Sequence, residues 1–203
     1  MSKLAKKLSA IALCTVFASM QMASAAIDTG LGNAVINNAN GGYVGLDKGT
    51  NSATLNFNNH SHVNWDTLNV GKGETLNFNA VDGAKGLTVV NTVNSGMTQV
   101  YGAINSNEGI AKLIISNPNG MLYDGATFTT AGDLMLTTQP IDVKLSDGKI
   151  DYTSKAGAQA LNGIEINHVR IAGSTKQIKI IPSQSIPVIA CFVPAAMSES
   201  QPV

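Results

Sequence analysis

The sequence predicts an all-β protein folded as a parallel β-helix, or β-solenoid, and three observations support this prediction. Charged residues make up 13% of the chain, and 20 Gly and 20 Asn stand in their place, whereas ordinary globular domains are about 25% charged. Short runs rich in Thr, Val, Ile, Leu and Phe alternate with turns containing Asn or Gly, which is typical of strands joined by tight corners. Similar runs also recur 21 residues apart, a repeat length that stacked coils use.

Residues 1–25 have the features of a secretory signal peptide. Three lysines within residues 3–7 precede an uncharged apolar region at Leu8–Met20, and Ala23-Ser24-Ala25 forms a cleavage pattern of small residues. The apolar region is too short for a membrane-spanning helix, which needs about 20 such residues. We expect export through the Sec machinery and cleavage after Ala25, with cleavage after Ala26 as the alternative.

The mature chain is long enough for one domain with its own core. Removing the three lysines of the signal peptide leaves 10 basic against 13 acidic residues. No basic patch is visible, so nucleic acid and anionic membranes are poor candidate partners. Cys191 has no cysteine partner once Cys14 leaves with the signal peptide, so packing and backbone hydrogen bonds must supply the stability.

An exposed end of a β-helix would pair with the strands of other chains, so it must be capped. Residues 27–44 are the expected N-terminal cap, with Val35, Ile36 and Val44 turned inward.

The repeat identifies the residues expected to stack between coils. Thr54-Leu55-Asn56-Phe57 recurs as Thr75-Leu76-Asn77-Phe78, and Leu113-Ile114-Ile115 is followed at the same offset by Leu134-Met135-Leu136. We therefore expect Leu55 above Leu76, and Phe57 above Phe78. The predicted stacking core comprises Leu55, Phe57, Leu76, Phe78, Leu113, Ile115, Leu134 and Leu136. An antiparallel sandwich with a turn about every 8 to 12 residues is the alternative that this spacing leaves open.

Asn117-Pro118-Asn119-Gly120 is the most specific motif of the chain. Pro118 fixes its own φ and favours an extended Asn117, and Asn119-Gly120 can supply the positive φ angles of a tight turn. The motif is then a turn that passes the chain from the strand at 112–116 to a strand at 121–123. Direct contact with a partner protein is the alternative.

The motif lies within a longer pattern that resembles a known family. Gln99–Ile104, Lys112–Ser116, the motif itself, Gly125-Ala126-Thr127-Phe128 and Gly132-Asp133-Leu134 follow one another in order. This order and spacing resemble the haemagglutination-activity, or two-partner-secretion, domain at the N-terminus of filamentous-haemagglutinin-like adhesins, cytolysins and contact-dependent toxins. The resemblance covers about residues 27–138. A second Asn-Pro-Asn-Leu motif that some members carry upstream is absent.

The resemblance implies a right-handed parallel β-helix that serves as a secretion address. In that family the domain crosses the inner membrane of a Gram-negative cell unfolded. A partner transporter, an outer-membrane β-barrel with periplasmic receptor modules, then captures it. The expected location is the cell surface or the medium. The leading functional hypothesis is a secretion-targeting domain, and the alternative is a stand-alone adhesive module that binds a host glycan or protein.

The composition changes near Pro140, where Asp and Lys return and Asn nearly vanishes. We assign residues 26–140 to the β-helix domain, 141–181 to further coils or strands outside the helix, and 182–203 to an irregular proline-rich tail. Residues 154–161 are a weak helix candidate. Family members run on into much longer repeats, so the tail is interpreted as a truncation remnant, a fragment boundary or the end of a short member.

No catalytic or cofactor site is predicted. His60 and His62 alternate onto one face of a strand but have no third metal ligand at a fitting spacing. The acidic residues are scattered and Arg170 is the single arginine, so no acid–base pair or nucleophile–base constellation emerges. We expect neither enzyme activity nor a bound metal.

Overall fold

The computed structural model describes residues 25–158, 160–172, 177–182 and 190–192. The expected signal peptide and most of the proline-rich tail lie outside this part of the chain. The described residues form strands and turns, and none of them belongs to a helix long and apolar enough to cross a membrane. Residues 154–158, 160 and 161, within the weak helix candidate, form the end of a strand and a turn instead, so that expectation is wrong.

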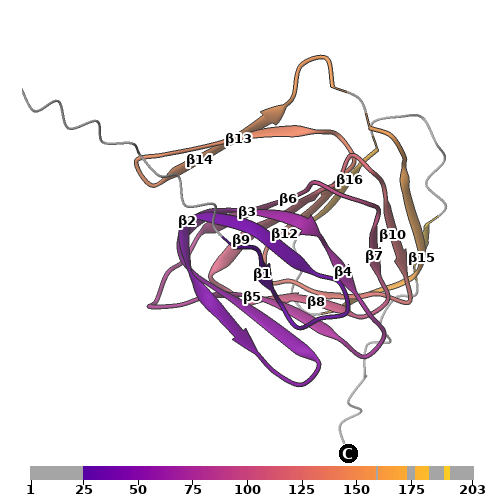
Figure 1. Ribbon diagram of the computed structural model, residues 1–203, viewed down its shortest axis with the longest axis horizontal. Helices are drawn as coiled ribbons and strands as arrows, with labels where there is room; N and C mark the ends of the chain where they lie inside the picture. Colours follow the sequence, from indigo (N-terminus) through magenta and orange to yellow (C-terminus); the bar gives the residue numbers. More distant parts are fainter. Residues whose placement is uncertain (1–24, 159, 173–176, 183–189, 193–203) are drawn as a thin grey trace, which may run out of the picture.

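The strands stack in parallel on three faces around one core, which confirms the β-solenoid (Figure 1). Face 1 contains the start of β3 (Ser52–Thr67), β5 (Thr75–Ala80), β8 (Ala103–Ser106), β11 (Thr127–Thr129) and the end of β15 (Ile164–Ala172). Face 2 contains the end of β3, β6 (Leu87–Val93), β9 (Ile110–Ser116), β12 (Asp133–Thr137) and β16 (Ile178–Ile181). Face 3 contains β4 (Asn69–Val70), β7 (Thr98–Val100), β10 (Met121–Asp124), the start of β15, and β17 (Ala190–Phe192).

Every ladder between coils is parallel in the described residues, so the antiparallel sandwich is excluded. The β-solenoid has about four turns, or coils, and in each coil the chain visits the faces in the order 1, 2, 3. Side chains alternate between the two sides of each strand. One side of every face therefore points into a shared apolar core, and the other points outward.

The predicted register is right for one pair of coils and wrong for another. Between β9 and β12 the offset is 21 residues, so Leu113 pairs with Leu134 and Ile115 with Leu136. Between β3 and β5 the offset is 23, because Ser52 pairs with Thr75. Leu55 consequently pairs with Phe78 rather than with Leu76, and Phe57 pairs with Ala80. The rings of Phe57 and Phe78 nevertheless stack across the two coils, as predicted. A displacement of two residues leaves every side chain on its original side of the sheet, so the sequence repeat could not detect it.

All eight residues of the predicted stacking core lie in the buried apolar cluster. Their exposed fractions range from 0% to 2%. The remaining members include Trp65, Tyr123 and Phe128, with the ring of Tyr123 edge-on to that of Phe128 at a centroid distance of 5.3 Å.

The N-terminal cap is an antiparallel strand. β2 (Val35–Lys48) runs antiparallel to the whole length of β3, and β1 (Ile27–Asp28) pairs with the start of β2. Ile36 is buried and Val35 is half-buried, but Val44 is 55% exposed, so its expected inward orientation is wrong. The register shifts on both sides of Tyr43, and such a bulge interrupts the inward–outward alternation.

A hairpin stands outside the β-helix between the fourth strand of face 2 and the return to face 3. β13 (Ile141–Ser146) and β14 (Lys149–Ser154) pair antiparallel with each other and lie over face 2 (Figure 1). Val90 and Ile114 point outward on this face and are nevertheless fully buried. The hairpin is bonded to this side of the face through Lys112 of β9, which donates to Tyr152 of β14. After the hairpin, β15 and β16 resume the coils, and residues 190–192 form β17 within the segment that was expected to be irregular.

Candidate functional site

The Asn117–Gly120 motif forms the turn between β9 on face 2 and β10 on face 3. The backbone N–H of Gly120 donates to the carbonyl oxygen of Asn117 at 3.1 Å, which closes a four-residue turn. Gly120 has a φ of 103°, whereas Asn119 keeps a negative φ. The expectation that both residues supply positive φ is therefore wrong for Asn119.

The side chain of Asn117 is fully buried and uses both ends of its amide. Its Nδ2 donates to the carbonyl oxygen of Gly96 and to Thr98 Oγ1, each at 2.9 Å, and its Oδ1 accepts from the N–H of Asn119 at 2.9 Å. Its backbone N–H donates to the carbonyl oxygen of Thr137 at 3.0 Å. The side-chain amide, with two donors and one acceptor oxygen, joins Asn117 to the preceding coil. The backbone bond to Thr137 joins it to the following coil, so Asn117 connects three successive coils.

The other residues of the motif are also engaged within the chain. Asn119 Nδ2 donates to the carbonyl oxygen of Asn94 at 3.2 Å, and the Asn119 carbonyl accepts from Asn162 Nδ2 at 3.0 Å. The carbonyl of Pro118 accepts from the N–H of Leu161 at 2.7 Å. The loop before β15 thus covers the motif, so the geometry favours a structural turn over direct partner contact.

A second buried polar tie joins Trp65 to Asn91 inside the core. Trp65 Nε1 donates to Asn91 Oδ1 at 2.9 Å, and Asn91 Nδ2 donates to the carbonyl oxygen of Ile114 at 3.0 Å. Both side chains are fully buried. The pair was not predicted from the sequence, although Asn91 within the apolar run Leu87–Val93 indicates a buried amide that requires partners.

Outward-facing asparagines form a ladder on face 1. Asn56 Nδ2 donates to Asp47 at 2.7 Å, Asn79 Nδ2 donates to Asn56 at 2.9 Å, and Asn107 Nδ2 donates to Asn79 at 2.6 Å. Parallel stacking repeats the same outward position in each coil, so the ladder explains part of the Asn content as coil-to-coil bonding rather than as turns.

The two histidines that could have suggested a metal site are engaged in hydrogen bonds. His60 Nδ1 accepts from the N–H of Thr88 at 2.8 Å, and His62 Nε2 lies 2.7 Å from Thr92 Oγ1. Burial lowers the pKa of His62, because desolvation disfavours the charged ring. The described residues contain no group of three or more His, Cys, Asp or Glu side chains arranged to hold a metal ion.

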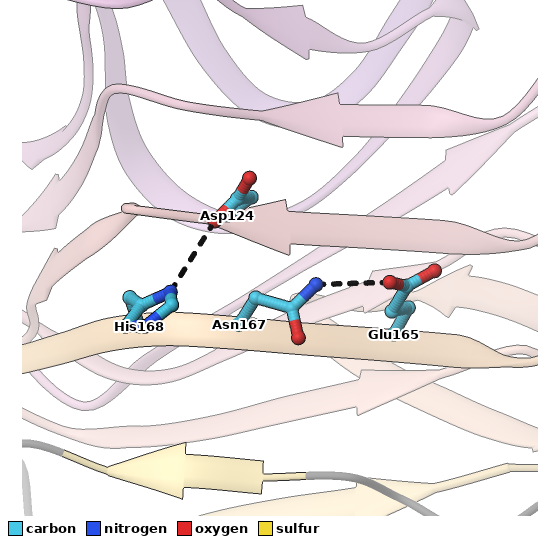
Figure 2. Close-up of polar contacts among 4 residues, drawn as sticks. All are labelled: Asp124, Glu165, Asn167 and His168. Carbon is cyan, nitrogen blue, oxygen red and sulfur yellow. Dashed lines mark hydrogen bonds and ion pairs between the residues drawn. The ribbon is translucent and has the colours of Figure 1, made fainter.

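An exposed polar cluster lies at the corner between faces 3 and 1 (Figure 2). His168 Nδ1 is 3.8 Å from Asp124 Oδ1, and Asn167 Nδ2 donates to Glu165 at 2.9 Å. His168 has a φ of 50°, where β15 turns from one face to the next. Its side chain is 74% exposed. A contact of this length between exposed side chains contributes little stability, and the cluster contains no buried acid–base pair.

A groove opens where the base of the hairpin lies over the last strands of face 2. Its volume is about 310 Å³, and its lining includes Lys112, Asp133, Met135, Tyr152, Gln177 and Lys179. Lys112 Nζ donates to Tyr152 Oη at 3.1 Å. The sequence did not predict this groove, because its residues come from five strands that only the stacked coils and the hairpin bring together.

Comparisons with known proteins identify the fold. No family model matches the chain, and no curated protein sequence matches it. Among solved structures, the chain is similar to the crystal structure of the HMW1 secretion domain from Haemophilus influenzae, with a TM-score of 0.54 and 18% sequence identity. The match covers 71% of this chain and 38% of that one. At this identity the likeness extends to the β-helical fold.

Proposed function

We propose that this chain is a secretion-targeting domain of the two-partner type, recognised by an outer-membrane transporter. The observation that carries the proposal is the shared β-helical fold, since the solved structure that it resembles is that of a secretion domain. The order of motifs between residues 99 and 134 supports the same assignment independently of the fold. The finer assignment, to the haemagglutination-activity family of adhesins and haemolysins, rests on that motif order.

The architecture suits vectorial folding at the cell surface. β2 covers the first coil as an antiparallel strand, so the stack is closed at its N-terminal end. The coils can then add one after another towards the C-terminus, because each coil buries its core against the one before it. Free energy released by stacking outside the cell would oppose backsliding of the chain through a transporter.

The buried turn at Asn117 supports an indirect role for the motif in this proposed function. Its polar groups bond to one another and to neighbouring coils, so they have little left to offer a transporter. We therefore assign transporter recognition to other parts of the domain, engaged before folding, and we assign the motif to the stability of the folded coils. In this proposal the domain is non-catalytic and needs no cofactor.

A stand-alone adhesive module is the second candidate, and the groove beneath the hairpin favours it. The two candidates differ in how the protein leaves the cell. A secretion domain depends on its transporter, whereas an adhesive module that is exported by another route does not.

The test is secretion of the domain fused to a small reporter, in cells with and without a cognate two-partner transporter. We expect the reporter in the medium of the first strain and in the periplasm of the second. A folded reporter fusion that stays periplasmic in both strains, or that reaches the medium in both, would refute the secretion-domain proposal.

A further inference from the structure

Charged and polar side chains line the groove beneath the hairpin. Asp133 of β12 is the backbone partner of Lys112 of β9, so the two opposite charges sit side by side on face 2. Lys112 nevertheless donates to Tyr152 Oη rather than to Asp133. Its ammonium is 5.8 Å from the centre of the tyrosine ring. Together with the 3.1 Å bond, this places the ammonium on the hydroxyl side of the ring, so that Lys112 itself does not cover the ring face.

Several polar side chains of the groove have no side-chain partner among the described residues, although Thr137 Oγ1 donates to the carbonyl oxygen of Ile181. Lys179 of β16 is the backbone partner of Met135 and extends from the groove floor. Neither Lys179 nor Asp133 forms an ion pair among the described residues, and the side-chain amides of Gln139 and Gln177 bond to no described side chain. These groups are available to a ligand.

From this arrangement we propose that the groove binds an acidic saccharide, a sugar ring that bears a carboxylate. Two ammonium groups face one carboxylate in the lining, which favours a ligand with a single negative charge. Asp133 would repel a bare anion but accepts hydrogen bonds from sugar hydroxyls. The amides of Gln139 and Gln177 can both donate and accept.

The apolar part of the lining fits the same ligand class. Met135 and the face of Tyr152 supply apolar surface against which the C–H groups of a sugar ring can pack. The volume of about 310 Å³ lies at the lower end of the range for small-molecule sites, about 300 to 1,000 Å³. A small ligand or the end of a glycan chain therefore fits better than a folded protein.

The experiment uses the purified protein and two sugars that differ only in the acidic group, D-glucuronate and D-glucose. Backbone amide resonances recorded by NMR during titration report both the site and the affinity. We expect glucuronate to shift residues on β12, β14 and β16, and to bind at least about tenfold more tightly than glucose, since one charge-assisted contact is worth about that factor. Equal binding of the two sugars, no binding, or shifts located elsewhere would overturn the proposal.

Variants separate a sugar site from a simple anion site. Lys179→Met should weaken glucuronate binding about tenfold or more, whereas Lys144→Met, on the outward face of the same hairpin, should leave it unchanged. Asp133→Ala should weaken glucuronate binding and strengthen binding of inorganic phosphate. If Asp133→Ala strengthens both, or if phosphate binds the unaltered protein as tightly as glucuronate, the groove is an anion site and the saccharide proposal is wrong. None of these readouts involves a transporter, so they are independent of the proposed secretion role.

Discussion

The ring of Phe57 lies nearly parallel to the ring of Phe78 in the next coil, with centroids 6.2 Å apart and an angle of 10° between the planes. The two residues are not backbone partners, because Phe57 pairs with Ala80 and Phe78 pairs with Leu55. Aromatic side chains can reach such diagonal neighbours across a ladder. Tyr43 of the cap packs against the other side of this pair, 6.0 Å from the ring of Phe57, so an aromatic column joins the cap to the first two coils.

Truncation of this column should destabilise the N-terminal coils. Phe78→Ala removes a fully buried ring, and such changes cost about 3–5 kcal/mol in the free energy of unfolding. The matched control is Asn77→Ala on the same strand, which points outward and loses hydrogen bonds worth about 1 kcal/mol each. Denaturant unfolding followed by circular dichroism measures both. Equal losses in the two variants would contradict the role of the column.

The buried hydrogen bond between Trp65 and Asn91 predicts a loss of stability when only one of its two partners is replaced. Trp65→Phe keeps an aromatic ring in the core but leaves Asn91 Oδ1 without its indole donor. A buried acceptor left without a partner costs about 1–3 kcal/mol, added to the loss of ring volume. Trp65→Phe combined with Asn91→Leu removes both polar partners. The free energy of unfolding lost by the double variant should therefore be smaller than the sum of the losses of the two single variants. A double-mutant cycle from denaturant unfolding tests this coupling, and strict additivity would show that the bond contributes nothing.

Two glycines with positive φ separate backbone strain from steric contact. A Cβ on Gly120 would lie 2.6 Å from the Cβ of Asn162, whereas a Cβ on Gly125, with a φ of 67°, would meet nothing within 4 Å. Gly125→Ala should therefore cost only the left-handed backbone penalty, about 1–2 kcal/mol. Gly120→Ala should cost more in thermal or denaturant unfolding. Asn162→Gly should recover part of that excess, and a Gly120→Ala cost no larger than that of Gly125→Ala would argue against close packing of the loop before β15 on the motif.

The motif variants connect stability with secretion. Asn117→Ala removes the tie between three coils and should cost about 1–3 kcal/mol, because it leaves buried partners unsatisfied. Asn119→Ala loses one exposed hydrogen bond and should cost about 1 kcal/mol or less. Secretion of the reporter fusion should follow this order. A strong secretion defect in Asn119→Ala with unchanged stability would instead show direct transporter contact.

The sequence predicted the fold class and the inward residues because both depend on local patterns. Residues of the TLNF repeat alternate between the two sides of a strand, so each inward residue could be named without knowledge of its partner. Register was predictable only where no extra residues enter a corner, as between β9 and β12. Where two extra residues enter, as between β3 and β5, the pairing shifts by two residues. The inward pattern is unchanged, so the sequence shows no sign of this shift.

The candidate site was only partly predictable. The sequence identified Asn117–Gly120 as a turn, because Pro and Gly restrict the backbone locally. It could not identify Thr98 or Asn162 as partners of that turn, because both contacts cross to a neighbouring coil, 19 and 43 residues away along the chain. The hairpin and its groove were missed for the same reason: Lys112 and Tyr152 are 40 residues apart, and the length of the hairpin determines which strands it covers.

The half-buried ring of His62 predicts a pH dependence of stability. Burial holds its pKa below the ordinary value, which is about 6.5. As the pH falls below that value, the unfolded chain takes up a proton that the folded chain resists. The contribution of His62 is therefore complete above about pH 6.5 and is lost progressively as the pH falls towards the folded-state pKa. His62→Gln should flatten the stability profile between about pH 5 and pH 8, a window in which carboxylates of ordinary pKa remain ionised. Denaturant midpoints measured across that window would contradict the assignment if the variant and the unaltered protein gave parallel curves.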